Sequence, residues 1–575
     1  MIAHWANYAH KDYLPFVKDA RPELVQVGFY GGHYWSLAHT QHGSGYPAHF
    51  PKIGLKANRD WLIQRNTDLH KLDALVIGHF NIEFLVGNPK GKDGARGFFK
   101  FYNELWDKKE LGPKPVKSPL QLLEKNADGT PLTNNTYSIG GMKEYWACLN
   151  NPHWHKVLKA WVKHGIDAGV DGFIINYFYR HNCLCEHCQR EFRNYLGEHF
   201  TTQELKKQFK INGLATHQFK EIGAWHNPAE STPWKREQLR FSQMATKKCF
   251  DEVFVKYGRS LKPDLIVGQW NHIGRFSQIN ADERCLLPKE YWAKDEDYLW
   301  YSTGNSACYT DLKNGYLGEG TLHSRYIRGA TGGKPFTLGK YESTRTRAAI
   351  AELVANGGAP MGFYTRFTNP EARKVIVQYY NFIRRNDHIY RHNRSAAENV
   401  LLYPRSNVHA GNVKAVEQFL KLGDTLLNRH ILFDVLPDDL ASPEKLAQYK
   451  TVYSVDAQKL KASNRFQITA PSTVRASISQ PSKGNQLHMH FVNYNRIEPT
   501  NPKSAGGGIH DEKPIAAEGV FFSMELPTGK SLKRARFLTP ENTKARELPV
   551  RVNGSRTTVS VPKFLVYGVV ELELE

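Results

Sequence analysis

Long apolar segments and cysteines are both scarce in this chain of 575 residues. The longest apolar runs, such as 172–175 and 519–522, are far shorter than the roughly 20 residues that a membrane-spanning helix needs, so we predict a soluble protein with no membrane partner. The seven cysteines are an odd number, which excludes a fold built wholly on internal disulfides. The first twenty residues lack the basic start, apolar stretch and cleavage site of a signal peptide, which leaves both a cytoplasmic and a periplasmic localisation open.

Acidic residues are outnumbered by basic ones. The chain has 77 Lys+Arg against 56 Asp+Glu, a formal net charge of +21, and such an excess favours an anionic partner. The basic residues are spread along the chain and no nucleic-acid-reading motif occurs, so we predict an anionic oligosaccharide rather than a nucleic acid. A solvated basic surface that only aids solubility is the alternative.

Short apolar runs rich in β-branched and aromatic residues alternate with amphipathic segments, as in a parallel sheet covered by helices on both faces. The eight predicted strands are Leu24–Tyr30, Ala74–Phe80, Tyr145–Asn150, Asp171–Phe178, Leu265–Asn271, Tyr298–Thr303, Pro335–Tyr341 and Gly358–Tyr364. Apolar spacing predicts helices between them, for example at 155–168 and 344–355. Eight βα units predict a (β/α)8 TIM barrel over residues 1–395, longer than the roughly 250 residues typical of the fold, which implies long loops.

Two further domains are predicted after the barrel. Residues 396–464 have strands at 399–404, 430–436 and 451–455 and a helix at 415–429, which indicates a truncated flavodoxin-like α/β domain. From 465 to 575 the pattern changes to alternating apolar runs separated by Gly, Pro and Asn turns, which is typical of an antiparallel β-sandwich. The predicted fold class is therefore α/β with a C-terminal β-sandwich.

Three cysteines crowd into six positions directly after the fourth predicted strand. Cys183, Cys185 and Cys188 form C-x-C-x2-C, and Cys148 lies at the end of the third predicted strand. Because successive strand ends are neighbours in a barrel, these four thiolates could hold a structural zinc ion in a tetrahedral site. Buried free cysteines, or His187 in place of one ligand, are the alternatives.

The segment ACLNNPHWHKVLKAWVKHGIDAGVDGFIINYFYRHNCLCEHCQREFRNYL resembles the β-galactosidases of glycoside hydrolase family 42. These share a Cys before an N-x-P turn, a strand ending in Asn-Glu, the C-x-C-x2-C motif and F-x3-L. KPFTLGKYES and ANGGAPMGFYTRF are similar to that family's seventh and eighth strands, and LLNRHILFDVLPDD to its second domain, so the resemblance spans residues 145–440. It implies that Cys148, Cys183, Cys185 and Cys188 are zinc ligands, that Glu342 is the nucleophile, and that the protein is a homo-oligomer.

The chain departs from that family at the acid/base position, where it has Asn176-Tyr177 in place of Asn-Glu. A retaining glycosidase needs two carboxyl groups about 5 to 5.5 Å apart. A Tyr hydroxyl with a pKa of about 10 is a poor proton donor at neutral pH. Glu83 and Glu144, near predicted strand ends, are the candidates for a replacement carboxyl group.

Cationic and aromatic side chains gather at the predicted strand ends, where active sites of this fold lie. The predicted catalytic residues are Tyr177, His181, His272, Lys340 and Glu342. The predicted substrate-binding residues are His33, His79, Asn176, Tyr179, Arg180, Arg275, Tyr364 and Arg366. For each of them a packed, hydrogen-bonded structural role is the alternative.

A pocket rich in cations suits a substrate that brings its own negative charge, such as a uronate or a sulfated sugar. Cations would neutralise a uronate carboxylate, after which Tyr177, His181 or His272 abstracts the adjacent proton and a leaving group is eliminated. The predicted function is therefore a carbohydrate-active lyase or dehydratase. The alternatives are a family-42-like glycoside hydrolase that uses Glu342 on a galactose-type or sulfated substrate, and a saccharide-binding protein without catalysis.

Overall fold

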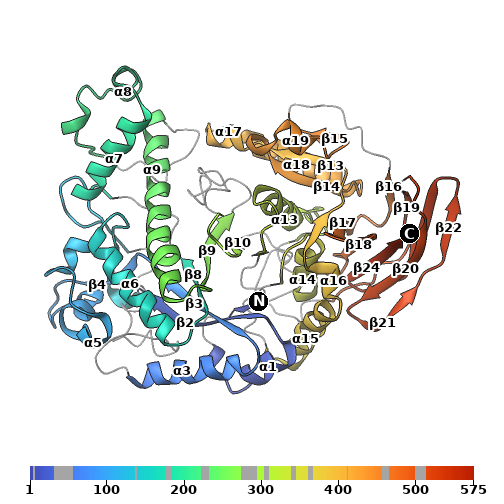
Figure 1. Cartoon of the computed structure of the whole chain (residues 1–575), viewed down its shortest axis with the longest axis horizontal. Coiled ribbons are helices and arrows are strands. Elements are labelled where there is room, and N and C mark those ends of the chain that lie inside the picture. The colour runs from blue at the N-terminus through green and yellow to red at the C-terminus, as the bar shows by residue number, and fades with distance from the viewer. Residues whose placement is uncertain are drawn as a thin grey trace.

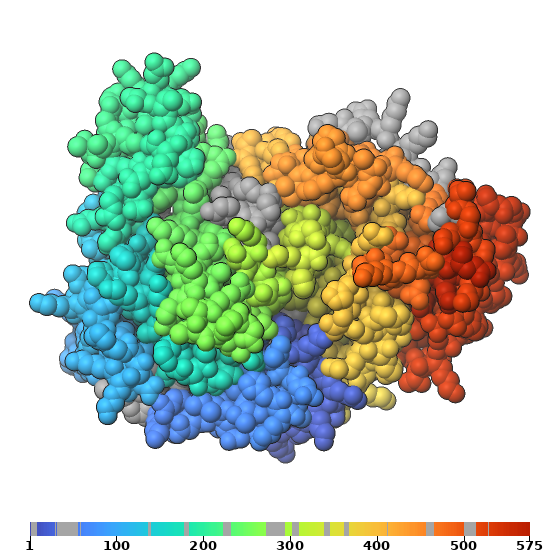
Figure 2. All heavy atoms as spheres, in the orientation of Figure 1, coloured from blue at the N-terminus to red at the C-terminus, as the bar shows by residue number. Residues whose placement is uncertain are grey.

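The computed structural model describes residues 1–3, 7–31, 56–135, 139–176, 183–221, 232–273, 294–303, 310–338, 345–360, 367–410, 412–455, 465–498, 513–526 and 528–575. A parallel sheet surrounded by helices occupies the N-terminal part, and smaller sheets follow it on one side (Figure 1). Helices α7 (Glu186–His199) and α8 (Thr202–Phe209) project from the side opposite to the C-terminal strands (Figure 2). Among the helices in these ranges, none is both long enough and apolar enough to cross a bilayer.

Within the described residues the central sheet has seven parallel strands. In spatial order they are β1 (Ile2–Ala3), β2 (Leu24–Gly31), β3 (Leu75–Asn81), β8 (Gly172–Asn176), β9 (Ile266–Ile273), β10 (Leu299–Thr303) and β11 (Phe336–Leu338). Residues 358–360 bond to both of its edges. The Ala359 N–H donates to the Phe336 carbonyl at 2.8 Å, and the Met1 nitrogen donates to the Pro360 carbonyl at 2.8 Å. The sheet is thus curled in a TIM-barrel-like arrangement.

The third predicted strand, 145–150, is wrong as a member of this sheet. Strand β7 (Lys143–Trp146) pairs antiparallel with β4 (Phe84–Asn88) in a separate four-stranded sheet. Its run is apolar because Tyr145 faces the main core while Trp146 faces a small cluster with Phe84. The central sheet begins instead with β1, whose two residues are too few to give a compositional signal. Of the last predicted strand, residues 361–364 lie outside the described residues.

Helix α6 (Pro152–Asp167) shows how the sequence specifies the helical layer. The Asn151 side chain accepts the N–H of His153 at 2.9 Å, and Pro152 occupies the first turn, where it costs no hydrogen bond. Trp154, Leu158 and Trp161 recur at helical spacing and are buried in the main core, where the two Trp rings lie beside Phe98 and Phe101. Other helices of this layer are α3 (Lys56–His70), α9 (Pro233–Phe250), α13 (Glu319–Ala330), α14 (Thr346–Ala355) and α15 (Pro370–Arg385).

A three-stranded parallel sheet follows the central sheet in the chain. Its spatial order is β14 (Phe433–Pro437), β13 (Asn399–Tyr403) and β15 (Thr451–Tyr453), and helix α18 (Lys414–Asn428) connects β13 to β14. Helix α13 packs directly on β14, where Gly329 leaves room for the backbone of Val435. The three strands and the helix lie where the sequence predicts them.

The last part of the chain forms two antiparallel sheets. One contains β12 (Asn393–Ser395), β17 (Val474–Pro481), β18 (Gln486–Asn493), β24 (Tyr567–Leu574), β20 (Leu532–Thr539) and β21 (Asn542–Glu547). The other contains β16 (Phe466–Thr469), β19 (Val520–Glu525), β23 (Arg556–Val561) and β22 (Val550–Asn553). They share one apolar core, in which the rings of Phe491 and Phe522 lie 6.0 Å apart. Helix α14 covers the outer face of the larger sheet.

Candidate functional site

Four buried cysteines form one cluster, in agreement with the predicted ligand set. The sulfurs of Cys148, Cys183, Cys185 and Cys188 all lie within 4.8 Å of one another. The Cys148 Sγ is 3.6 Å from that of Cys185 and 3.5 Å from that of Cys188. A tetrahedron with Zn–S bonds of about 2.3 Å has its sulfurs about 3.8 Å apart, so the cluster has nearly the dimensions that a metal site with four cysteine ligands requires.

Neighbouring groups orient these sulfurs. The Lys125 N–H donates to the Cys183 Sγ at 3.4 Å, and the Asn150 side-chain amide donates to the Cys188 Sγ at 3.6 Å. Such N–H···S bonds stabilise thiolates, and a bound cation would stabilise them further. Burial raises the pKa of the Cys148 and Cys188 thiols. Hydrogen bonds from the other three sulfurs, of which the bond from Cys148 has the largest effect, lower the pKa of the Cys185 thiol. The cluster can therefore hold a metal ion.

Cys148 is part of the cluster, but its position in the fold differs from the predicted one. It follows β7 of the small sheet and does not end a strand of the central sheet. The backbone fixes its place, because the Cys148 N–H donates to the Leu122 carbonyl at 2.8 Å and the Leu184 N–H donates to the Lys125 carbonyl at 2.8 Å. His187 is no part of the cluster: its ring lies on the exposed side of α7 beside the Arg190 guanidinium.

A polar layer lies inside the curled sheet near the C-terminal ends of β3 and β8. The His79 ring nitrogens lie 3.3 Å from the Gln26 side-chain nitrogen and 3.3 Å from the Asn176 side-chain nitrogen. The ring centroid of His79 is 5.3 Å from that of Trp270, which stacks on Trp300. These partners come from β2, β8, β9 and β10, so His79 points to the inside of the sheet and not to the helical layer.

Each ring nitrogen of His79 has a hydrogen-bond partner in this layer. A neutral imidazole has one N–H and one acceptor nitrogen, so one of the two flanking amides must present its oxygen to the ring. Gln26 fits that role, because its side-chain oxygen is buried and has no hydrogen-bond partner among the described residues. The strand periodicity could have identified Gln26, which is a polar residue at the centre of an otherwise apolar strand.

Most other predicted site residues lie outside the described residues. These are His33, Tyr177, Tyr179, Arg180, His181, Arg275, Lys340, Glu342, Tyr364 and Arg366. His272 belongs to β9, where its backbone pairs with Ser302 of β10. From the predicted set, the structure therefore brings His79 and Asn176 together in the polar layer, and it brings the four cysteines together in a separate cluster. The roles of the remaining residues stay predictions.

The two candidate replacement carboxyl groups point in different directions. Both Glu83 and Glu144 are fully buried. The Glu83 carboxylate is close enough to Cys249 of α9 to raise the pKa of that thiol, after the larger effects of burial and of Glu252. Glu144 lies on the sheet face of Val86 and Trp146, away from the main core. Strand β4 follows β3 after two residues, so the small sheet that carries Glu144 begins beside the C-terminal end of β3.

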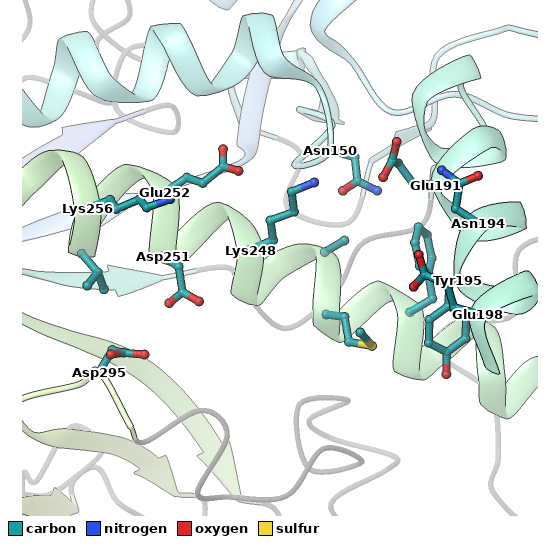
Figure 3. A pocket seen from close by; sticks show the side chains of 14 residues that line it. Asn150, Glu191, Asn194, Tyr195, Glu198, Lys248, Asp251, Glu252, Lys256 and Asp295 are labelled. Atoms are coloured by element: carbon teal, nitrogen blue, oxygen red, sulfur yellow. The ribbon is translucent and has the colours of Figure 1, made fainter.

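A groove of about 680 Å³ lies along α7 and α9, outside the central sheet (Figure 3). Glu191 and Glu198 line it from α7, and Lys248 lines it from α9. Asn150, which bonds to Cys188, joins the groove to the cysteine cluster. The groove lies beside the candidate metal site but away from the polar layer inside the sheet.

Comparisons with known proteins agree with the fold. No protein-family model matches the sequence, and no curated protein matches it either. The structure is similar to α-L-fucosidase isoenzyme 2 from Paenibacillus thiaminolyticus, with a TM-score of 0.59 and 12% identity over 100% of this chain and 97% of that one. It is also similar to a β-galactosidase from Bacillus circulans sp. alkalophilus, with a TM-score of 0.57 and 12% identity over 97% and 96% of the two chains.

A third similar structure is a β-galactosidase from the Antarctic haloarchaeon Halorubrum lacusprofundi, with a TM-score of 0.52 and 12% identity over 100% of both chains. Likeness at such identities shows the fold, which is a TIM-barrel-like fold of the glycoside hydrolase type with added β-domains. The prediction of a lyase or dehydratase is wrong on this comparison, because the similar structures named here, which match along almost their whole length, are glycoside hydrolases: a fucosidase and two galactosidases.

Proposed function

We propose that this chain is a glycoside hydrolase related to the family 42 β-galactosidases and that it acts on a galactose-type substrate. The observation that carries the proposal is the likeness of the whole chain, and not of the barrel alone, to a fucosidase and two galactosidases. The net charge of +21 favours substrates that carry anionic groups, such as sulfated galactosides.

In the proposed reaction Glu342 is the nucleophile, as the resemblance to family 42 implies. A second carboxyl group must protonate the leaving oxygen. Tyr177 replaces the family's Glu, so another residue has to supply this proton. We favour Glu144 over Glu83, because Glu144 lies on the face of the small sheet that is turned away from the main core, whereas Glu83 lies near Cys249 in the helical layer. The four cysteines would hold a structural zinc ion, which has no open position for a substrate.

Hydrolysis of nitrophenyl β-galactoside, nitrophenyl α-L-fucoside and sulfated galacto-oligosaccharides tests this proposal. Glu342→Gln should lower kcat/KM by at least about 10³-fold on every substrate that the wild type hydrolyses. Glu144→Gln should lower it by about 10² to 10⁴-fold on substrates with poor leaving groups, and much less on dinitrophenyl glycosides, which need no proton donor. Glu198→Gln, on the outer groove, is the matched control and should leave kcat/KM unchanged.

Unchanged turnover in Glu342→Gln would exclude Glu342 as the nucleophile. Tight binding of galactosides without any product in the wild-type protein would exclude hydrolysis, and it would favour a saccharide-binding protein that retains the fold without catalysis.

A further inference from the structure

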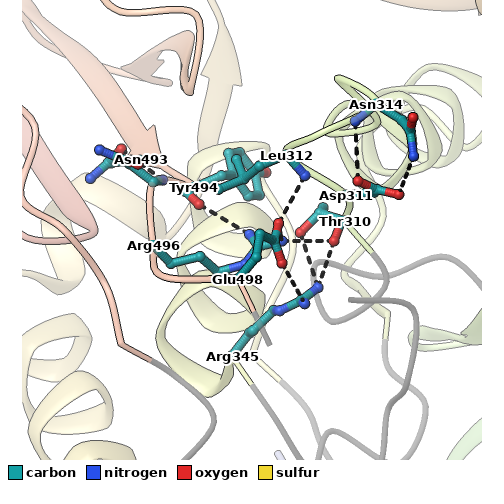
Figure 4. Close-up of polar contacts among 10 residues, drawn as sticks. Thr310, Asp311, Leu312, Asn314, Arg345, Asn493, Tyr494, Arg496 and Glu498 are labelled. Atoms are coloured by element: carbon teal, nitrogen blue, oxygen red, sulfur yellow. Dashed lines mark hydrogen bonds and ion pairs between the residues drawn. The ribbon is translucent and has the colours of Figure 1, made fainter. Parts of the chain in front are cut away.

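Two buried guanidinium groups meet one carboxylate where the central sheet and its helices contact the C-terminal sandwich (Figure 4). Arg345 is 2% exposed and Arg496 is 6% exposed. The Glu498 Oε2 lies 3.5 Å from the Arg345 Nη2, and the Glu498 Oε1 lies 2.7 Å from the Arg496 Nη2. Glu498 therefore lies between two buried positive charges, and its loss would leave both without this counter-charge.

The same groups hold a third segment of the chain. The Thr310 carbonyl oxygen accepts from the Arg345 Nη1 at 2.7 Å and from the Arg496 Nη2 at 2.7 Å. Two residues further on, the Leu312 N–H donates to the Glu498 Oε1 at 2.9 Å. We call Thr310, Arg345, Arg496 and Glu498 the junction cluster. It joins three segments that are far apart in the sequence.

Two of these segments follow strands of the central sheet. Thr310 comes after β10, and Arg345 comes after β11 and directly precedes α14. Chain segments that follow the C-terminal ends of barrel strands form the active-site face of this fold. Arg345 is three residues beyond Glu342 in the sequence. The cluster thus holds the backbone next to the residue proposed as the nucleophile.

The third segment is anchored in the C-terminal sandwich. The Ile497 N–H donates to the Lys513 carbonyl at 2.9 Å, and the Ile515 N–H donates to the Asn495 carbonyl at 2.9 Å. These bonds fix the chain on both sides of Arg496. The backbone that precedes Glu498 is therefore held by hydrogen bonds, so the Glu498 carboxylate can fix the positions of the groups that it contacts.

The Arg345 backbone needs such support. Its φ of 56° and ψ of 36° are in the left-handed region, which is unfavourable for a residue with a side chain. A non-glycine residue keeps this conformation only where its surroundings impose it. The bonds of its guanidinium to Thr310 and Glu498 supply that constraint at the start of α14.

We propose that Glu498 is a positioning residue for glycoside hydrolysis: through the junction cluster, the sandwich domain fixes the backbone at Arg345 and so the placement of Glu342. This inference rests on the proposed function. It assigns the C-terminal sandwich a part in the reaction, with no contact to the substrate. Loss of Glu498 should therefore change kcat more than KM.

The test compares Glu498→Gln with Glu525→Gln. Glu525 is also in the sandwich, where it pairs with Arg556 at 2.9 Å, but it is 49% exposed and belongs to β19 of the smaller sheet, outside the junction cluster. Glu498→Gln should lower kcat by about 10- to 100-fold with KM changed less than about 3-fold. Hydrogen exchange should become faster in peptides that cover 310–316 and 345–355. Glu498→Asp should restore part of kcat, and Glu525→Gln should match the wild type.

Two outcomes would overturn the proposal. One is a folded Glu498→Gln protein with wild-type kcat and wild-type exchange at both peptides. The other is faster exchange throughout the sandwich together with a loss of kcat that matches a fall in the folded fraction, because that result describes a stability effect only. If the wild-type chain hydrolyses no glycoside, the proposed function fails, and the exchange data alone decide whether Glu498 constrains 310–316 and 345–355.

Discussion

The sulfurs of Cys148 and Cys188 lie 3.5 Å apart although 40 residues separate the two cysteines in the sequence. Cys148 precedes α6 and Cys188 is in the first turn of α7, so the pair closes a loop that contains the whole of β8. Asn176, at the end of β8, is seven positions before Cys183. A metal ion in this cluster would therefore tie both ends of the segment that carries Asn176 and the predicted residues Tyr177 and His181.

Loss of one sulfur ligand should remove the metal and destabilise this segment. We expect elemental analysis to find about one zinc ion per chain in the wild type and much less than one in Cys185→Ser. Because metal binding contributes directly to folding free energy, the Tm should fall by several degrees. Removal of zinc from the wild type with a chelator should lower the Tm to a similar extent.

Cys249→Ala is the control for the metal prediction. Cys249 is also fully buried, but it is in α9 and outside the cluster. This variant should keep its zinc even if packing losses lower its Tm. Equal zinc contents in Cys185→Ser and Cys249→Ala would contradict a site formed by the four cysteines.

Close packing of α13 on β14 gives a second prediction. A Cβ atom at Gly329 would lie 1.9 Å from the Val435 carbonyl oxygen, so Gly329→Ala forces the helix and the strand apart. Overpacking of this kind costs about 1–3 kcal/mol, and thermal unfolding should show it. Gly197→Ala in α7 is the matched control, because a Cβ there meets only the end of the Leu214 side chain, at 3.3 Å. An equal Tm for the two variants would contradict the packing described here.

The sequence predicts the strands that have long apolar runs and fails where an element is short or irregular. Strand β1 has two residues and depends on bonds to β2 and to Pro360. Both partners are more than twenty residues away in the sequence, so no local pattern predicts this strand. The run at 145–150 is apolar like a barrel strand because both faces of the small sheet are buried, and composition does not distinguish these two situations.

Sequence patterns likewise identify one part of the proposed functional residues and not the other. Close spacing in the sequence identifies Cys183, Cys185 and Cys188, and a family motif identifies Cys148. The junction cluster has no such signal, since Arg345 and Glu498 are 153 residues apart and neither belongs to a motif. Contacts between domains depend on how the domains dock, and a local pattern carries no information about that docking.

Buried neutral histidines give a prediction for how the stability of the fold depends on pH. Burial lowers the pKa of His488 to about 4, a shift that the nearby Glu571 carboxylate opposes and that His388 adds to. The unfolded chain therefore binds a proton below about pH 6.5 that the folded chain binds only near pH 4, so stability is full above pH 6.5 and falls as the pH drops from 6.5 toward 4. The contribution of this one residue is at most about 3 kcal/mol.

His488→Gln cannot take up this proton, so the difference in Tm between pH 7 and pH 5 should be smaller in this variant than in the wild type. His490, whose pKa burial also lowers, would still contribute to the remaining difference. The matched control is His199→Gln, which changes an exposed imidazole at the end of α7 and should keep the wild-type dependence on pH. A His488→Gln profile identical to that of the wild type would show that His488 binds its proton equally well in the folded and the unfolded chain.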